Sequence, residues 1–203
     1  MYKLPYFTET DSEKVFEFMQ QNPFAIIVGM DDRFPVATHV PLQISRIENK
    51  IILTGHIMKE TDHYKAFSKN ENVLVIFHGP HCYVSASWYV KKNVASTWNY
   101  MTVHAKGKLK LTNNDETKKI IENITNQYEA GESEAAFNKL PGEYVARLSK
   151  AIVGFTIGIE NVENVFKLSQ NHDATTRKQI IENLESLEDY KASQIANEMR
   201  TRL

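Results

Sequence analysis

Histidine side chains are concentrated where the sequence predicts β-strands. Of the seven histidines, five lie on or at the ends of predicted strands: His39, His56, His78, His81 and His104. Imidazole is a common metal ligand, but only His78 and His81 are closely spaced and no carboxylate cluster accompanies them. We therefore expect no metal site. These histidines are expected to hydrogen-bond the backbone or a ligand, with a metal or haem site as the lesser alternative.

A second group combines aromatic and small polar side chains: Tyr83, Ser85, Ser87, Trp88, Tyr89, Thr97, Trp98, Asn99 and Tyr100. Trp and Tyr join a flat apolar face to one polar group, so they suit the wall of a pocket for a planar heterocycle whose edge Asn and Ser could bind. An aromatic corner of the core has the same composition, and residue types alone favour it. The polar segment 166–171, with Lys167 as its cation, is predicted either to be a solvated loop or to cover such a pocket.

Short β-rich runs must position these groups. They cover residues 24–28, 36–44, 51–57 and 73–77, and are bounded by turn residues such as Glu48-Asn49-Lys50 and Gly79-Pro80. This pattern predicts an antiparallel meander. The strand predicted over residues 97–111 is long enough to bend around a barrel, and the run 151–157 should close the sheet with a strand distant in sequence.

Helical periodicity appears between and after these strands. It predicts helices within residues 12–22, 59–68, 115–131 and 143–150. Beyond residue 171 the chain is polar and helical, with a narrow apolar stripe made of Ile180, Ile181, Leu184 and Leu187. We expect this tail to pack on the barrel or on a partner subunit.

Length and composition limit the classes of protein. With 203 residues and 42% apolar residues, the chain suits one well-buried domain. The sequence contains no G-x-G-x-x-G after a strand, no P-loop, no G-x-S-x-G and no H-E-x-x-H, which argues against a Rossmann enzyme, a kinase and a typical hydrolase. Lys and Arg (24) nearly balance Asp and Glu (25), so no overall field attracts nucleic acid.

The expected compartment is the cytoplasm. The first residues lack a secretory signal pattern, and no run of 18 apolar residues predicts a membrane span. Cys82 is the single cysteine, so no disulfide can form within the chain, as suits a reducing compartment.

Five ordered motifs resemble those of the PaiB family. They are residues 33–42 (RFPVATHVPL), Gly55-His56, residues 75–85 (VIFHGPHCYVS), residues 97–100 (TWNY) and residues 166–171 (FKLSQN). The resemblance covers roughly residues 1 to 172. It implies a mainly β fold with helices, namely an FMN-binding split β-barrel similar to pyridoxamine-phosphate oxidases, in a homodimer. It also implies a link to negative transcriptional regulation, because the family is named for a regulator of protease synthesis and sporulation.

The resemblance also implies which residues bind the flavin. Ala37, Thr38, His39 and Val40 are expected along the edge of the isoalloxazine, and His56 and Lys59 at the phosphate. The other expected flavin-binding residues are Tyr83, Ser85, Trp98, Asn99, Lys167 and Gln170. Trp98 and Asn99 are expected to stack on the ring and bind its edge, within the subunit or across the dimer interface. No catalytic residue is assigned.

The sequence departs from the family between Met58 and Tyr64. The family usually has a small residue, a basic residue, then Asn-Pro and Trp; Lys59 keeps the charge here, whereas Asp62 adds an anion near the expected phosphate. The predicted domain boundary lies between an FMN-binding split barrel, residues 1–172, and a helical extension, residues 173–203.

Several functions fit this prediction. The first is a flavin-dependent oxidoreductase or flavin reductase, in which the flavin carries the redox chemistry. The second is a flavin-sensing transcriptional regulator, although the absence of a helix-turn-helix signature and the mixed charge of the C-terminal helices argue against direct DNA binding. The third is a haem-binding split barrel. The last is an interaction module that has lost its cofactor.

Overall fold

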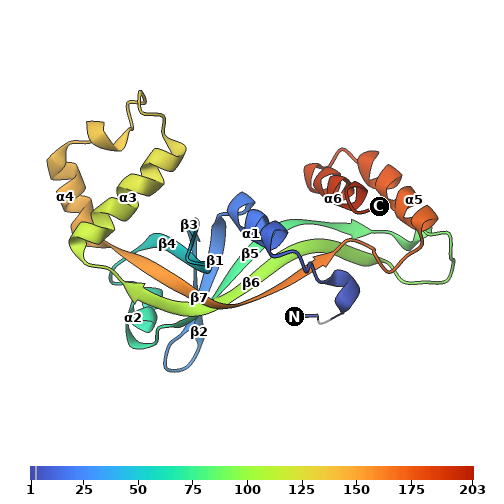
Figure 1. The fold of residues 1–203 in the computed structure, drawn as a ribbon, viewed down its shortest axis with the longest axis horizontal. Coiled ribbons are helices and arrows are strands. Elements are labelled where there is room, and N and C mark those ends of the chain that lie inside the picture. Colours follow the sequence, from blue (N-terminus) through green and yellow to red (C-terminus); the bar gives the residue numbers. More distant parts are fainter. Residues whose placement is uncertain (3) are drawn as a thin grey trace. The chain divides into compact units, whose positions relative to one another are not determined.

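The computed structural model describes residues 1–2 and 4–203. Seven strands form one sheet (Figure 1): β1 (Phe24–Met30), β2 (Pro35–Pro41), β3 (Gln43–Ile47), β4 (Lys50–Met58), β5 (Asn72–Val84), β6 (Thr97–Leu111) and β7 (Ile152–Lys167). The α-helices are α1 (Ser12–Gln21), α2 (Asp62–Lys69), α3 (Asn114–Tyr128), α4 (Gly142–Ala151), α5 (Ala174–Glu185) and α6 (Tyr190–Arg200). Three short 3-10 helices are η1 (Pro5–Phe7), η2 (Ala86–Trp88) and η3 (Phe137–Lys139). The predicted mainly β fold with a helical tail is confirmed.

The strand order is β2-β1-β5-β6-β7-β4-β3. β7 therefore lies between β6 and β4, which confirms that a strand distant in sequence completes the sheet. β3 and β4 form a hairpin whose turn residues Glu48 and Asn49 have φ of 47° and 67°. Positive φ at both central residues is typical of the tight turns that match strand twist, so the turn expected there is confirmed.

Two predictions for residues 36–80 were wrong. The run 36–44 is not one strand, because the chain changes partner at Leu42: β2 pairs with β1, β3 pairs with β4, and the Leu42 N–H donates to the Pro23 carbonyl at 2.9 Å. Gly79-Pro80 is not a turn but lies inside β5. Gly79 serves close packing there, since a Cβ would stand 2.6 Å from the Phe18 ring. Pro80 lies beyond the β1 pairing, which covers only Leu74 to Ile76 of β5.

The chain forms two compact units, and strands β5, β6 and β7 contribute residues to both. Unit 1 comprises Met1–Phe18, His78–Val103 and Glu163–Leu203, and unit 2 comprises Met19–Phe77 and His104–Val162. The core of unit 2 includes the fully buried side chains of Ile27, Leu53, Val75, Phe77, Phe155 and Ile157. Among the described residues, no helix combines the length and the apolarity that crossing a membrane requires.

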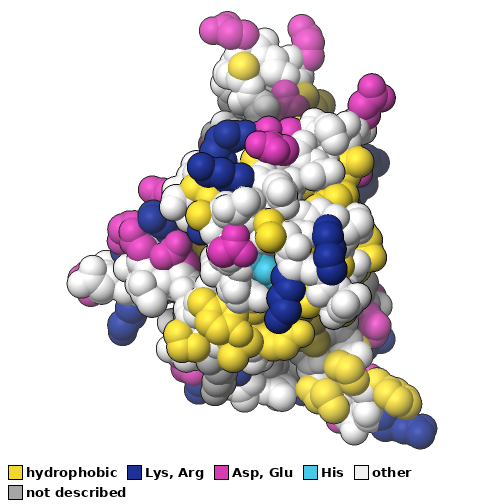
Figure 2. All heavy atoms as spheres, turned by 90° about the vertical axis from the view of Figure 1, so that its right-hand side faces the viewer, with side chains coloured by type: hydrophobic (Ala, Val, Ile, Leu, Met, Phe, Trp, Pro, Cys, Tyr) yellow, Lys and Arg dark blue, Asp and Glu magenta, His cyan; other side chains and the backbone are white. Residues whose placement is uncertain are grey.

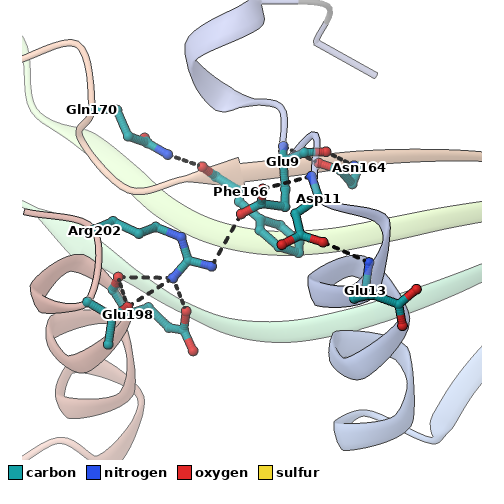
Figure 3. Close-up of polar contacts among 9 residues, drawn as sticks. Glu9, Asp11, Glu13, Asn164, Phe166, Gln170, Glu198 and Arg202 are labelled. Atoms are coloured by element: carbon teal, nitrogen blue, oxygen red, sulfur yellow. Dashed lines mark hydrogen bonds and ion pairs between the residues drawn. The ribbon is translucent and has the colours of Figure 1, made fainter.

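The helical tail contributes to the core of unit 1. Ile180, Ile181 and Leu184 are buried as the apolar stripe predicts, whereas Leu187 is 43% exposed. Arg202, near the C terminus, forms ion pairs with Glu198 and with Glu9 (Figure 3). The tail is thereby joined to the N-terminal segment within this unit. The boundary between residues 172 and 173 stays a prediction.

Candidate functional site

The first group of predicted site residues lies on β2, in unit 2. Ala37 and His39 are exposed, Thr38 is half-buried and Val40 is buried. β2 stands at one end of the strand order, where it pairs with β1 along its length. An edge strand keeps one row of backbone donors and acceptors that no neighbouring strand occupies. These backbone groups could hydrogen-bond the rim of a planar heterocycle. The His39 ring stacks on the exposed Phe24 ring at 6.2 Å.

His56 and Lys59 lie three residues apart at the end of β4. His56 is half-buried, and its Nδ1 is a buried atom without a hydrogen-bond partner. Desolvation by burial lowers the pKa of His56, which keeps the ring neutral around pH 7. The Lys59 backbone N–H donates to the Ala151 carbonyl at 2.9 Å. Within the described part of the chain, its ammonium has no hydrogen bond or ion pair. The end of β4 therefore offers the Lys59 ammonium to an anion, with the unpaired Nδ1 of His56 buried nearby in the sequence.

The carboxylate of Asp62, the anion that the family pattern lacks, already contacts its sequence neighbour His63. It accepts from the His63 backbone N–H at 2.7 Å and lies 3.1 Å from His63 Nδ1. The hydrogen bond from that backbone N–H is the main cause of the lowered pKa of Asp62. The helix that follows is capped by Thr61, whose hydroxyl accepts from the Tyr64 N–H. The Asp62 carboxylate thus interacts with the first turn of its own helix, α2.

Two other predicted site residues, Tyr83 and Trp98, lie in unit 1 beside His78 and His81. We call these four residues the aromatic cluster. The ring centroids of His78 and His81 are 4.7 Å apart, and Trp98 lies 6.2 Å from His81 and 6.0 Å from Tyr83. Tyr83 and Trp98 are 50% and 53% exposed, whereas Tyr89 of the same predicted group is buried, so only part of that group belongs to the core. Figure 2 shows hydrophobic side chains gathered in patches on the face turned to the viewer, among charged ones.

Burial and nearby basic groups act on His78 of the aromatic cluster. The pKa of His78 is lowered first by burial, then by the charges of His81 and Lys191. Lys191 Nζ lies 3.5 Å from His81 Nε2. A neutral His78 keeps one ring nitrogen as an acceptor or metal ligand. Within the described residues, however, no three His, Cys, Asp or Glu side chains gather as metal ligands would.

Asn99 is fully buried instead of facing solvent. Its Nδ2 donates to Ser169 Oγ at 3.0 Å and lies 3.4 Å from Met199 Sδ, and Ser169 Oγ is 3.1 Å from Asn99 Oδ1. Ser169 is also buried and has a φ of 62°. Asn99 therefore joins β6, the segment after β7 and helix α6. Its predicted contact with flavin stays a prediction.

Asn99→Ala should destabilise unit 1 by about 1–3 kcal/mol, because the Ser169 hydroxyl would be left buried without its partner. The expected result is a lower melting temperature and faster amide hydrogen exchange in α6. Asn197→Ala, at an exposed position of the same helix, is the control and should change little. Equal melting temperatures for Asn99→Ala and Asn197→Ala would contradict this structural role.

The remaining predicted residues are held by local hydrogen bonds. Lys167 Nζ donates to Thr97 Oγ1 and lies 5.8 Å from the Phe7 ring centroid, and burial lowers its pKa. Gln170 accepts from the Leu168 N–H at 2.7 Å and donates to the Phe166 carbonyl at 2.5 Å (Figure 3). Ser85 caps η2 by accepting from the Ser87 N–H. Their contacts with flavin stay predictions.

Sequence reasoning did not predict that three polar atoms, His56 Nδ1, Tyr89 Oη and Arg177 Nε, are buried without a hydrogen-bond partner in the described part of the chain. It also missed a pocket on the α3 side of β4 and β7, lined by Thr54 and Thr156. In the sequence, the only signal for that pocket is a threonine in each of two strands, Thr54 in β4 and Thr156 in β7, which are distant along the chain.

Comparison with known sequences gives a family match. Residues 1–161 match the family model described as "Putative FMN-binding domain". The chain is 35% identical over 204 residues to the Bacillus subtilis protein named "Protease synthase and sporulation protein PAI 2", covering 100% of this chain and 98% of that protein. It is also 27% identical over 228 residues to an uncharacterized Emericella nidulans protein, covering 92% of this chain and 91% of the other.

Solved structures show the same fold at low identity. The FAD and heme binding protein from Mycobacterium smegmatis superimposes with a TM-score of 0.62 at 16% identity, covering 84% of this chain and 78% of that one. The flavocytochrome Anf3 from Azotobacter vinelandii superimposes with a TM-score of 0.64 at 15% identity, covering 82% and 72%. The predicted split-barrel fold is confirmed.

Proposed function

Because the chain belongs to the PaiB family, whose model is described as an FMN-binding domain, we propose that it binds FMN. The β2 edge would hold the rim of the isoalloxazine, and His56 and Lys59 at the end of β4 would hold the phosphate. The single observation that carries this proposal is the pair of unoccupied nitrogen groups at the end of β4, one of them the buried Nδ1 of His56.

The chemistry of the residues fits the cofactor. A phosphate dianion favours charge-assisted donors, which Lys59 supplies directly. A bound anion would also raise the pKa of His56, which burial lowers in the protein alone. When bound, FMN would supply the capacity to accept and release a hydride or electrons. The residues of this chain would bind and orient it.

The biological role that we propose is flavin-dependent redox chemistry or flavin sensing, linked to negative regulation of transcription. The name of the Bacillus subtilis relative supports a link to protease synthesis and sporulation. We propose an indirect route, because α5 and α6 carry mixed charge, with Glu182, Glu185, Glu188 and Asp189 exposed among basic residues, and this balance gives DNA phosphates no strong net attraction. The proposal includes a cytoplasmic homodimer, the arrangement that the family resemblance implies.

Haem binding is the second candidate. Two observations favour it: His78 and His81 lie with ring centroids 4.7 Å apart beside the half-exposed Trp98, and a structural neighbour is described as binding FAD and heme. A neutral imidazole is a common axial ligand of haem iron. An absorbance spectrum separates the two candidates, because flavin and haem absorb in different bands.

The first test is titration of the purified protein with FMN. We expect quenching of flavin fluorescence that saturates near one FMN per chain, with a Kd of about 10 µM or less, which corresponds to about 7 kcal/mol. Added haemin should give no shifted Soret band. Absence of saturable FMN binding would overturn the proposal, and a shifted Soret band without flavin binding would replace it by the haem candidate.

Trp98→Ala should weaken FMN binding by about threefold to tenfold, since an aromatic stack contributes about 0.5–1.5 kcal/mol. Trp88→Ala is the matched control, because Trp88 is the other tryptophan and is not among the predicted flavin-binding residues. In a Trp88→Phe background, Trp98 is the single tryptophan, and its fluorescence should be quenched by FMN. Unchanged affinity in Trp98→Ala and no quenching would remove Trp98 from the site.

A further inference from the structure

A pocket of about 430 Å³ lies in unit 2, on the side of strands β4, β6 and β7 that α3 covers. This volume is within the usual range of small-molecule sites. The pocket is lined by Thr54, Lys110, Leu111, Thr112, Glu116, Lys119, Ile120 and Thr156. None of these residues is among those assigned to the flavin. The pocket is therefore a separate candidate for ligand binding.

Hydroxyl groups of two strands line the pocket together. Thr54 of β4 and Thr156 of β7 are directly opposite each other in the antiparallel pairing, and opposite residues point to the same face of a sheet. Among the residues that the structure describes, the Thr54 hydroxyl has one hydrogen bond, a long one of 3.4 Å to Gln43 Oε1. In the described residues, the Thr156 hydroxyl has no hydrogen-bond partner. Both groups remain available to a ligand.

The wall formed by α3 is fixed by a buried hydrogen-bond network around Thr117. The Thr117 hydroxyl donates to the Asn113 carbonyl at 2.7 Å and accepts from the Gly154 N–H at 2.9 Å. Because its proton is already used, the 3.1 Å contact with Thr112 Oγ1 must be donated by Thr112. Gly154 allows this close packing, since a Cβ there would lie 2.6 Å from Thr112 Oγ1. The pocket is thus preformed.

The charges at the pocket favour an anion. Lys110 of β6 and Lys119 of α3 are exposed, and among the described residues neither ammonium has a hydrogen bond or ion pair. The charge of Lys110 contributes only a minor lowering of the pKa of Glu71, which is hydrogen-bonded to Lys108. The carboxylate of Glu116 accepts from the Asn113 N–H in the capping box of α3. The pocket lining therefore has two lysine ammonium groups without a partner among the described residues, and one carboxylate, that of Glu116, which is already hydrogen-bonded.

We propose that this pocket binds a small organic carboxylate with an apolar body. Leu111 and the buried Ile120 provide apolar contact surface. Lys110 and Lys119 would pair with the carboxylate, and the threonine hydroxyls would hydrogen-bond polar atoms of the ligand. This site is independent of the FMN proposal. Thr54 is separated by one residue from His56 on β4, so a ligand here would contact the strand that carries the proposed phosphate site.

The test uses phenylacetate and its neutral analogue phenylacetamide as probes, followed by amide chemical-shift changes in nuclear magnetic resonance spectra of the full chain. We expect saturable shifts at Thr112, Lys119 and Ile120 with phenylacetate. Phenylacetamide should bind about tenfold more weakly, since it has the same shape without the charge. Equal binding of both probes, or no saturable shift at these residues, would overturn the proposal.

Substitutions of the lining residues test whether phenylacetate binds in this pocket. Lys110→Gln combined with Lys119→Gln should weaken phenylacetate binding by about tenfold, as expected for two partly exposed ion pairs. Lys118→Gln is the matched control, because Lys118 is the exposed neighbour on α3 and does not line the pocket. Thr156→Val keeps the shape and removes the free hydroxyl, and should weaken binding by about threefold. If FMN displaces phenylacetate and the lysine double variant loses FMN affinity, the pocket belongs to the flavin site and the proposal fails.

Discussion

Replacing both His56 and Lys59 by alanine should weaken FMN binding by about a hundredfold, since each charge-assisted donor to a phosphate contributes about 1.5–3 kcal/mol and about 1.4 kcal/mol is tenfold. Each single variant should lose about tenfold. His56 contributes a ring whose Nδ1 is buried and unpaired, and Lys59 an ammonium that no described residue occupies. The fold should persist, because neither side chain is fully buried. Fluorescence titration measures the affinity and circular dichroism checks the fold.

Two controls make this prediction specific to phosphate. Lys50→Ala removes an exposed cation at the opposite end of the same strand, and its FMN affinity should stay within a factor of about two. Riboflavin, which lacks the phosphate, should bind the protein and the double variant about equally. Wild-type FMN affinity in the double variant would place the phosphate elsewhere. A parallel loss of riboflavin affinity would show that the ring site, not the phosphate site, had been damaged.

The periodicity of the sequence predicted most of the elements because each has a local cause. The bounds of β6 are those predicted, residues 97 to 111, and α3 begins at the capping box of Asn113 and Glu116. The prediction ended β5 and β7 too early. β5 continues through Gly79-Pro80, where close packing on Phe18 explains the glycine, and β7 continues to Lys167 through polar residues such as Glu160 and Asn161. The packing of Gly79 on Phe18 joins residues far apart in the sequence, so the local pattern could not predict it.

The candidate site was less predictable than the fold. Residue types and motifs identified His56 and Lys59, and the structure adds that one nitrogen is buried without a partner. The same reasoning could not tell that Asn99 is fully buried or that the Gln170 amide is used by its own loop. Polar side chains of one type can bind a ligand or hold the chain together. Only their burial and their partners separate the two roles.

The motif Gly55-His56 links this site to the core, through Phe155. Gly55 pairs with Phe155 across β4 and β7, and a Cβ on Gly55 would stand 2.7 Å from Phe155 Cζ and 3.0 Å from Leu42 Cδ2. The phenylalanine ring is fully buried, so it occupies the space that a larger residue at position 55 would need. The glycine is required by packing, and it places the backbone of His56.

Phe155→Ala should therefore destabilise the protein by about 3–5 kcal/mol, the usual cost of removing a buried aromatic ring. Urea denaturation followed by circular dichroism should show a lower midpoint with a similar slope. Phe34→Ala is the matched control: Phe34 is 64% exposed, and the change should stay within about 0.5 kcal/mol. Similar midpoints for the two variants would contradict the packing role of Phe155.

A double-mutant cycle tests whether Gly55 and Phe155 share one space. Gly55→Ala alone should cost about 1–3 kcal/mol through overpacking, and Phe155→Leu alone should leave a cavity. Combined, the added methyl group should fill part of the space that the ring leaves, so the double variant should be more stable than the sum of the single changes predicts by about 0.5–3 kcal/mol. Additive costs would mean that the two side chains do not compete, and the glycine before His56 would then need a different explanation, such as close approach of a ligand to the backbone.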